Sequence, residues 1–119
     1  MTSKPSLNRE EQALEEFLQS ATGLVAVCVT DPFHPGSQLM ADRLQALAES
    51  ERGLRAVAVG LEGYRSWARR HRIAGTPCIA VFRGGLLIRR LNGILTEEDL
   101  YERLTSGRQH QGAHPGAGL

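Results

Sequence analysis

The side chains best suited to covalent chemistry in this sequence are two cysteines, Cys28 and Cys78, which stand far apart along the chain. A disulfide oxidoreductase needs two thiols that can close a bond, one of them a nucleophile of lowered pKa. Cys28 lies inside an apolar run, where a lone cysteine usually acts as a small hydrophobic residue. Cys78 directly follows Pro77 and lies nearer to a possible functional edge. A disulfide between the two would need a Cα separation of about 4.4–6.8 Å. The pattern therefore predicts no redox dithiol.

The histidines do not have the spacing of a metal site. His34, His71, His110 and His114 are scattered, and the last two lie in a Gly-rich C-terminal stretch. Structural and catalytic zinc sites group their ligands at short, characteristic spacings. We therefore expect no metal, and nothing in the sequence calls for another cofactor.

Composition sets the outer limits of the function. The chain has 119 residues, 41% of them hydrophobic, and a formal net charge of +1. This length suits one globular domain. The apolar runs are far shorter than the roughly 20 residues that span a bilayer, and the first residues lack the apolar stretch of a secretory signal. Two cysteines fit a reducing compartment. We expect a cytoplasmic protein without membrane insertion.

The first half of the sequence predicts a helix and a βαβ unit. Asn8 and Glu11 form a capping box before an apolar stripe that ends near Ser20. Residues 24–29 are continuously apolar, as in a strand covered on both faces. A helix marked by Leu39, Met40, Leu44 and Leu47 then leads to a second strand over residues 54–59. The two strands should be parallel.

The second half predicts a short helix, a hairpin and a last helix. Leu61, Tyr64, Ala68 and His71 share one face of the short helix. Residues 79–82 and 86–91 flank a turn at residues 83–85, which makes the sheet mixed, with its fourth strand antiparallel to the central one. Thr96 and Asp99 cap a last helix, which should bury Leu100, Tyr101 and Leu104. Residues 106–119 are expected to be a disordered tail.

This order of elements is the order of the thioredoxin fold, which we expect for residues 1–105 with a mixed central sheet and flanking helices. The position where thioredoxins keep their CxxC cysteines reads Pro32-Phe33-His34-Pro35-Gly36 here, so the redox motif is absent. The resemblance also implies that Thr76-Pro77 is a cis bond beside this loop. Backbone groups of the preceding residue would then face outward, where an extended peptide can pair as an added strand.

The resemblance narrows to one family. Residues 29–32, Thr76-Pro77, residues 81–85 and Leu91-Asn92-Gly93-Ile94 are similar to the thioredoxin-like accessory proteins of membrane-bound uptake [NiFe] hydrogenases. The similarity covers about residues 10–105. It implies a cytoplasmic chaperone, not an enzyme, that binds the hydrogenase small-subunit precursor and its twin-arginine signal peptide, with a second maturation chaperone as a further candidate partner.

The candidate partner-binding residues come from the loop, the proline strand and the last helix: Asp31, Pro32, Phe33, His34, Thr76, Pro77, Glu97, Glu98 and Glu102. Asp31 is alternatively an Asx-turn residue, and His34 a solvated loop histidine. Phe33 either anchors a partner or tucks into the core. The acidic residues would attract a basic signal peptide.

Arginine is concentrated between residues 63 and 95, a stretch without Asp or Glu. This stretch is either a solvated basic face or a surface for an acidic partner. Few aromatic residues argue against nucleic acid. Two other functions stay open: a thiol enzyme or redox sensor that uses Cys78, and a generic adaptor with an unrelated partner.

Overall fold

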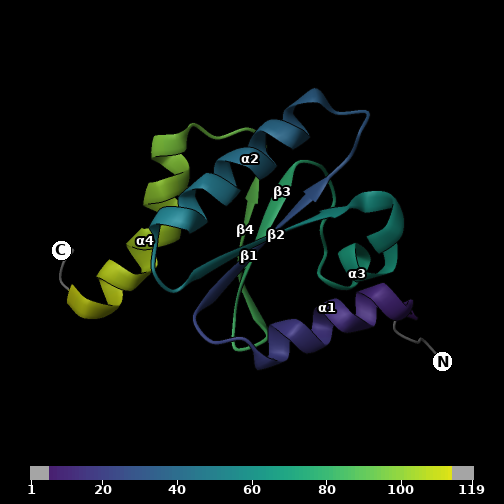
Figure 1. Cartoon of the computed structure of the whole chain (residues 1–119), viewed down its shortest axis with the longest axis horizontal. Coiled ribbons are helices and arrows are strands. Elements are labelled where there is room, and N and C mark those ends of the chain that lie inside the picture. The colour runs from purple at the N-terminus through teal and green to yellow at the C-terminus, as the bar shows by residue number, and fades with distance from the viewer. Residues whose placement is uncertain (1–5, 114–119) are drawn as a thin grey trace.

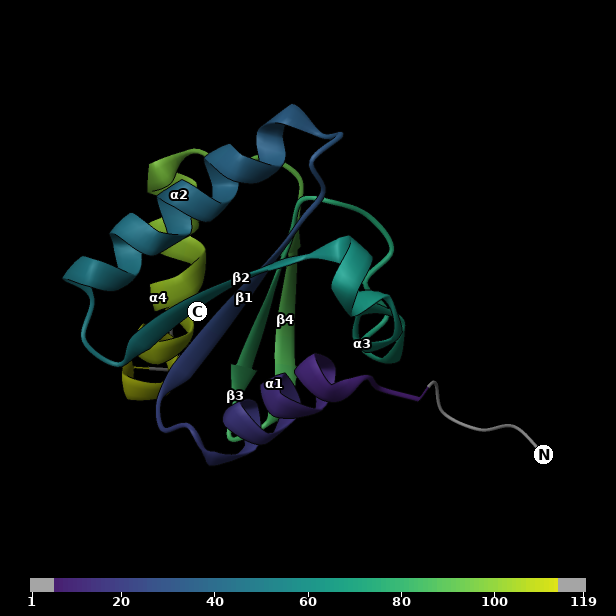
Figure 2. The same ribbon diagram turned by 45° about the vertical axis from the view of Figure 1, so that its right-hand side comes forward.

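The computed structural model describes residues 6–113, in which a four-stranded sheet lies between two layers of helices (Figure 1). Helices α1 and α3 cover one face and helices α2 and α4 the other, so the sheet separates two apolar clusters. Figure 2 shows α1 and α2 on opposite sides of the strands. None of the described helices is long and apolar enough to cross a membrane.

Helix α1, Arg9–Ser20, begins with the predicted capping box. The Glu11 backbone N–H donates to Asn8 Oδ1, and the Asn8 N–H donates to Glu11 Oε1, each at 2.8 Å. Because the two residues satisfy each other's backbone donors, the helix start is fixed locally. Leu14 and Leu18 are buried against the sheet.

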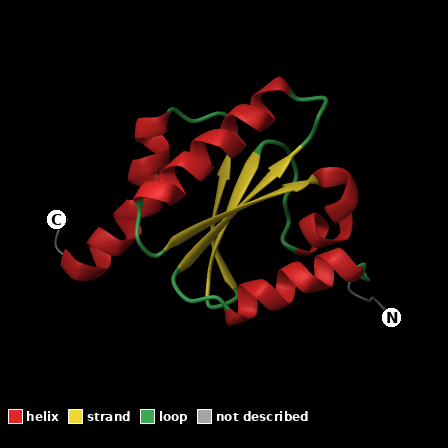
Figure 3. Cartoon of the chain, viewed as in Figure 1, coloured by secondary structure: helices red, strands yellow, loops and turns green. Residues whose placement is uncertain are grey.

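The strands are β1 (Leu24–Thr30), β2 (Leu54–Gly60), β3 (Cys78–Arg83) and β4 (Leu86–Asn92), in the spatial order β2-β1-β3-β4 (Figure 3). Strand β1 pairs parallel with β2, as predicted, and antiparallel with β3. Strand β4 pairs antiparallel with β3. The sheet is therefore mixed, as predicted, but the strand that runs antiparallel to the central β1 is β3, and β4 runs in the same direction as β1, opposite to the expectation.

Strand β1 is the centre of the core. Its residues 24–29 are all buried, and their side chains alternate between the two clusters, with Ala26 and Cys28 on the α2 face and Val25 and Val27 on the α1 face. The predicted hairpin joins β3 to β4 through Gly84 and Gly85, both at positive φ. A two-residue turn with positive φ at both positions matches the twist of the flanking strands.

Helices α2, Pro35–Ser50, and α4, Glu97–Ala113, pack on the same face. One expectation was wrong here: Tyr101, which should be buried, is 45% exposed. Leu39, one of the residues that indicated the helix, is 43% exposed. Leu39 lies in the first turns of α2, which extend past the end of the sheet (Figure 1). Tyr101 lies beside Leu100 and Leu104, which face the core.

The predicted boundary between the domain and its tail, at residues 105 and 106, falls inside α4. Where a disordered tail was expected, the helix continues to Ala113. The remainder of the predicted tail, residues 114–119, lies outside the described residues.

The connection from β2 to β3 contains a 3₁₀ turn, η1 (Leu61–Tyr64), and helix α3 (Arg65–Arg70). Its most buried residue is Trp67, which the sequence analysis did not single out. Glu11 Oε2 accepts a hydrogen bond of 2.7 Å from the Trp67 backbone N–H. His71 contacts Glu15 Oε2 through Nε2 at 2.5 Å and packs its ring against Trp67 and Phe82. These contacts attach α3 to α1.

Candidate functional site

Three loop segments meet at one end of the sheet. In the strand register Val29 pairs with Cys78 and Cys78 pairs with Asn92, so the end of β1, the start of β3 and the end of β4 lie together. The Gly93 N–H donates to the Pro77 carbonyl at 3.0 Å. The segments that carry Asp31 to His34, Thr76 with Pro77, and Gly93 with Ile94 therefore form one surface.

The loop after β1 is a closed turn held by its own polar groups. Asp31 Oδ1 accepts from the Phe33 N–H at 3.0 Å, and the Asp31 carbonyl accepts from the His34 N–H at 2.9 Å. The Asp31 N–H donates to the buried Ser37 Oγ at 3.1 Å. The structural alternative for Asp31, an Asx turn, is thus confirmed. Its contact with a partner stays a prediction.

His34 is the N-cap of α2, so its description as a solvated loop histidine was wrong. Its side chain is half-buried, and Nδ1 accepts from the Gly36 N–H at 3.3 Å. Pro35 follows at the first helical position, where its missing N–H removes no helical hydrogen bond. His34 therefore sets the start of α2, and through it the position of the loop.

Phe33 projects away from the core and is 91% exposed, which excludes the expectation that it might tuck inside. Ile94, 53% exposed, lies against Gly36: a Cβ placed on Gly36 would stand 2.2 Å from Ile94 Cδ1. Leu39 is exposed one helical turn beyond Gly36. We call Phe33, Leu39 and Ile94 the apolar rim; all three lie at or near the N-terminus of α2.

A hollow of about 220 Å³ adjoins the apolar rim. Its walls are the loop and the first turn of α2: Thr30, Asp31, Pro32, His34, Pro35, Ser37 and Gln38. Since the walls combine proline rings with polar side chains, the hollow could receive one side chain of a bound peptide next to the rim.

Thr76-Pro77 is a cis bond, as predicted. Pro77 is buried and Thr76 is half-buried. The Pro77 carbonyl already accepts from Gly93, so of the two residues Thr76 lies more open to a partner.

The acidic residues Glu97, Glu98 and Glu102 are exposed on α4, apart from the loop. Helix α4 begins next to the middle of α2, where the Leu95 N–H donates to Met40 Sδ at 3.3 Å and Arg43 Nη1 donates to the Leu95 carbonyl. Arg43 is about two helical turns from Gly36. A second hollow, of about 200 Å³, lies there between Arg43, Ala46, Leu47, Glu97 and Leu100. A partner that contacts both the apolar rim and the acidic residues of α4 must therefore extend along α2.

The two cysteines are free and buried, on opposite faces of the sheet. Cys28 pairs in register with Ile79, and Cys78 with Val29, and residues opposite each other on paired strands share a face. Cys28 and Val29 are consecutive in β1 and point to opposite faces of the sheet. The Cys78 thiol shares the face of Val29, so it lies on the other side of the sheet from the Cys28 thiol. Burial, with a smaller contribution from Cys78, raises the pKa of the Cys28 thiol to about 12. Burial also raises the pKa of Cys78, an effect opposed by Arg90.

Within residues 6–113 no three His, Cys, Asp or Glu side chains are grouped so that they could hold a metal ion. The residues that the sequence analysis missed are Gly36, Leu39 and Ile94. Ile94 stood in the Leu-Asn-Gly-Ile motif, but no sequence signal places it over the start of α2.

Comparison with solved structures shows the thioredoxin-like fold. The chain is similar to a mutant thioredoxin from Halobacterium salinarum NRC-1, with a TM-score of 0.75 and 15% sequence identity, over 97% of this chain and 100% of that one. No family model matches the sequence. No curated protein matches it either. The hydrogenase accessory family that the sequence resembles is therefore not supported by these comparisons.

Proposed function

We propose that this chain is a non-catalytic binding protein that holds an extended polypeptide across the apolar rim. The observation that carries the proposal is Phe33: an aromatic side chain, 91% exposed, on a turn closed by hydrogen bonds that Asp31 accepts from Phe33 and His34. Large rigid apolar side chains are the usual anchors of protein interfaces. Because the turn is already ordered, binding costs little further backbone entropy.

The thiol alternative lacks a reactive group in this geometry. A nucleophilic cysteine needs access to its substrate and a lowered pKa, whereas Cys28 and Cys78 are buried with raised pKa values. The burial of both thiols therefore argues against a thiol enzyme or redox sensor.

The partner that we propose is the small-subunit precursor of an uptake [NiFe] hydrogenase, with its twin-arginine signal peptide, in the cytoplasm. This part of the proposal is supported by the sequence resemblance. In it, the apolar rim contacts the hydrophobic segment of the signal, and the acidic residues of α4 attract its arginines. A second maturation chaperone could use the remaining surface of the signal or of the folded subunit.

Calorimetry or surface binding with the precursor tests the proposal. Phe33→Ala should weaken binding roughly tenfold or more, mainly by faster dissociation, because an anchor of this size contributes about 1.5–3 kcal/mol when buried. Leu86→Ala is the matched control: Leu86 is 71% exposed but lies beside the hairpin turn at the other end of the sheet, and its loss should leave binding unchanged.

Three outcomes separate the hypotheses. Equal binding of the mature subunit and the precursor would remove the signal peptide from the proposal. Binding of neither would contradict the hydrogenase partner and leave the generic adaptor. Unchanged precursor affinity in Phe33→Ala would show that the apolar rim is not the binding surface.

A further inference from the structure

Strand β2 is an open edge of the sheet. It pairs with β1 on one side, and within the described residues no strand pairs with its other side. The Gly53 carbonyl accepts from the Leu24 N–H at 2.8 Å, and the Val59 carbonyl accepts from Thr30 Oγ1 at 3.3 Å, so both point toward β1. Backbone groups alternate along a strand. The N–H and C=O groups of Ala56 and Ala58 therefore point outward.

The edge of β2 lacks the features that usually prevent strands from pairing. Its register with β1 runs without interruption from Leu54 to Gly60, it contains no proline, and Arg55 is its one charged residue. The opposite edge, β4, contains two arginines, and its pairing with β3 has a register irregularity opposite Val81/Phe82. Bulges and charges protect edge strands against pairing, so β4 is protected and β2 is open.

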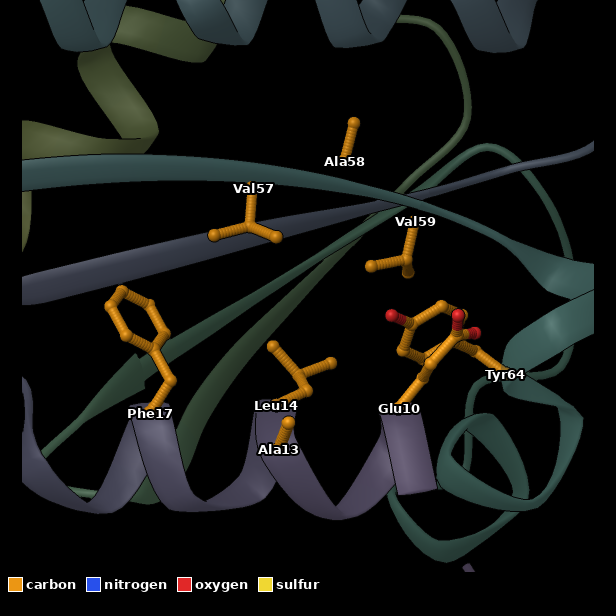
Figure 4. A pocket seen from close by; sticks show the side chains of 8 residues that line it. All are labelled: Glu10, Ala13, Leu14, Phe17, Val57, Ala58, Val59 and Tyr64. Atoms are coloured by element: carbon orange, nitrogen blue, oxygen red, sulfur yellow. The ribbon is translucent and has the colours of Figure 1, made fainter. Parts of the chain in front are cut away.

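An apolar groove of about 440 Å³ runs beside β2, between that strand and α1. Figure 4 shows Phe17 at one end of the groove, Leu14 near its middle, and Glu10 with Tyr64 at the other end. The full lining is Glu10, Ala13, Leu14, Phe17, Val57, Ala58, Val59 and Tyr64. Val57 is half-buried on the α1 face, so the groove is open along the free edge, whereas the Ala58 side chain points to the α2 face (Figure 4).

We propose that β2 pairs antiparallel with β2 of a second copy of this chain, about a two-fold axis at Val57. Ala56 of each copy then faces Ala58 of the other, and their outward N–H and C=O groups bond reciprocally. The two four-stranded sheets become one continuous sheet. The two grooves meet at the axis and form a shared apolar interior.

Charge complementarity favours a second copy as the occupant. Arg55 lies on the groove side of β2, with its guanidinium 5.9 Å from the centre of the Phe17 ring. About the proposed axis, Arg55 of one copy falls opposite Val59 of the other, at the end of the groove where Glu10 lies. The same pair forms twice, since the arrangement is symmetric. The groove thus has Arg55 at one end and Glu10 at the other, so in the symmetric dimer the arginine of each copy comes near the glutamate of the other.

Sedimentation velocity over a range of concentrations tests this inference, which is independent of the proposed function. Wild-type protein should shift from monomer to dimer as concentration rises. Ala58→Pro removes an outward N–H without touching the bonds to β1, and should abolish the dimer. Arg55→Glu should weaken self-association about tenfold, because it replaces two attractive contacts by repulsive ones. Combining Arg55→Glu with Glu10→Arg should restore it.

The matched control is Ile88→Lys, which places a charge on the other edge strand and should leave the dimer intact. Circular dichroism of each variant checks the fold. If Ala58→Pro does not fold, the test rests on Arg55→Glu and on its combination with Glu10→Arg. A wild-type monomer at all concentrations would overturn the inference. So would a dimer that survives both Ala58→Pro and Arg55→Glu, or that Ile88→Lys disrupts.

Discussion

Glu11 is a buried carboxylate that uses both of its oxygens. Oε1 accepts from the Asn8 N–H at 2.8 Å, and Oε2 accepts from the Trp67 N–H at 2.7 Å, while the side chain is 2% exposed. One side chain thus caps α1 and attaches the start of α3. The sequence predicted the capping box but not the second bond, because the partner lies far along the chain.

We predict that Glu11→Gln destabilises the protein nearly as much as Glu11→Ala, by about 2–4 kcal/mol. An amide has one acceptor oxygen, so its NH₂ group would face a backbone N–H at one of the two contacts. Urea unfolding measures the change. Glu16→Gln, on an exposed position of the same helix, is the control and should stay within about 0.5 kcal/mol of wild type. A Glu11→Gln variant as stable as the control would show that one of the two bonds is unimportant.

The residues of the candidate site were predictable in position but not in orientation. The Pro-flanked loop and Thr76-Pro77 could be placed together from the order of the elements, since the strand ends meet at one edge. Whether Phe33 faces solvent or core depends on side-chain packing, which leaves no periodic signal in a loop. His34 caps α2 through a ring nitrogen, and histidine is not among the residues whose presence usually marks an N-cap.

At the scale of elements, Gly36 joins the start of α2 to the loop after β4. A Cβ at this position would stand 2.2 Å from Ile94 Cδ1, the tip of a half-exposed side chain that is free to turn away. The absence of a side chain on Gly36 therefore allows Ile94 to complete the apolar rim.

We predict that Gly36→Ala displaces Ile94 and weakens partner binding about fivefold, the equivalent of roughly 1 kcal/mol of apolar contact, with little loss of stability. Alanine favours the helix, which offsets the cost of moving Ile94. Precursor binding and urea unfolding, measured together, check both parts. Gly60→Ala is the control, because a Cβ there meets nothing within 4 Å and φ is −83°. Unchanged binding in Gly36→Ala would remove Ile94 from the binding surface.

The short connection after β2 shows why the helical periodicity was only partly informative. The predicted face of Leu61, Tyr64, Ala68 and His71 assumed one continuous α-helix. The chain instead makes a 3₁₀ turn before α3, and such a turn has three residues per turn instead of 3.6. The change of period rotates the following residues, and Trp67 becomes the most buried one.

At the scale of the whole molecule, the exposed acidic residues of α4 form a charged surface on the α2 side of the sheet. The α1 side carries both signs, because α1 is rich in glutamate and α3 in arginine. Exposed charges act over a Debye length of about 8 Å at physiological salt. A basic partner is thus attracted to the α4 surface.

We predict that Glu97→Lys, Glu98→Lys and Glu102→Lys together lower precursor affinity mainly through the association rate, and that binding by wild type weakens as salt rises. The matched control reverses three other exposed glutamates, Glu16, Glu49 and Glu62, and so changes the net charge equally. If both triple variants lose the same amount, overall charge and not the α4 surface governs association. Salt-independent binding would contradict the electrostatic contribution.

Trp67 is the single tryptophan of the chain, is fully buried, and has its ring centre 4.8 Å from that of His71 and 5.8 Å from that of Phe82. Its fluorescence is therefore a reporter for the layer formed by α1 and α3. A shift of its emission to longer wavelength would follow the opening of that layer. A partner bound at the apolar rim, in contrast, would leave the emission maximum unchanged, so one intrinsic optical signal can separate loss of the fold from occupation of the site.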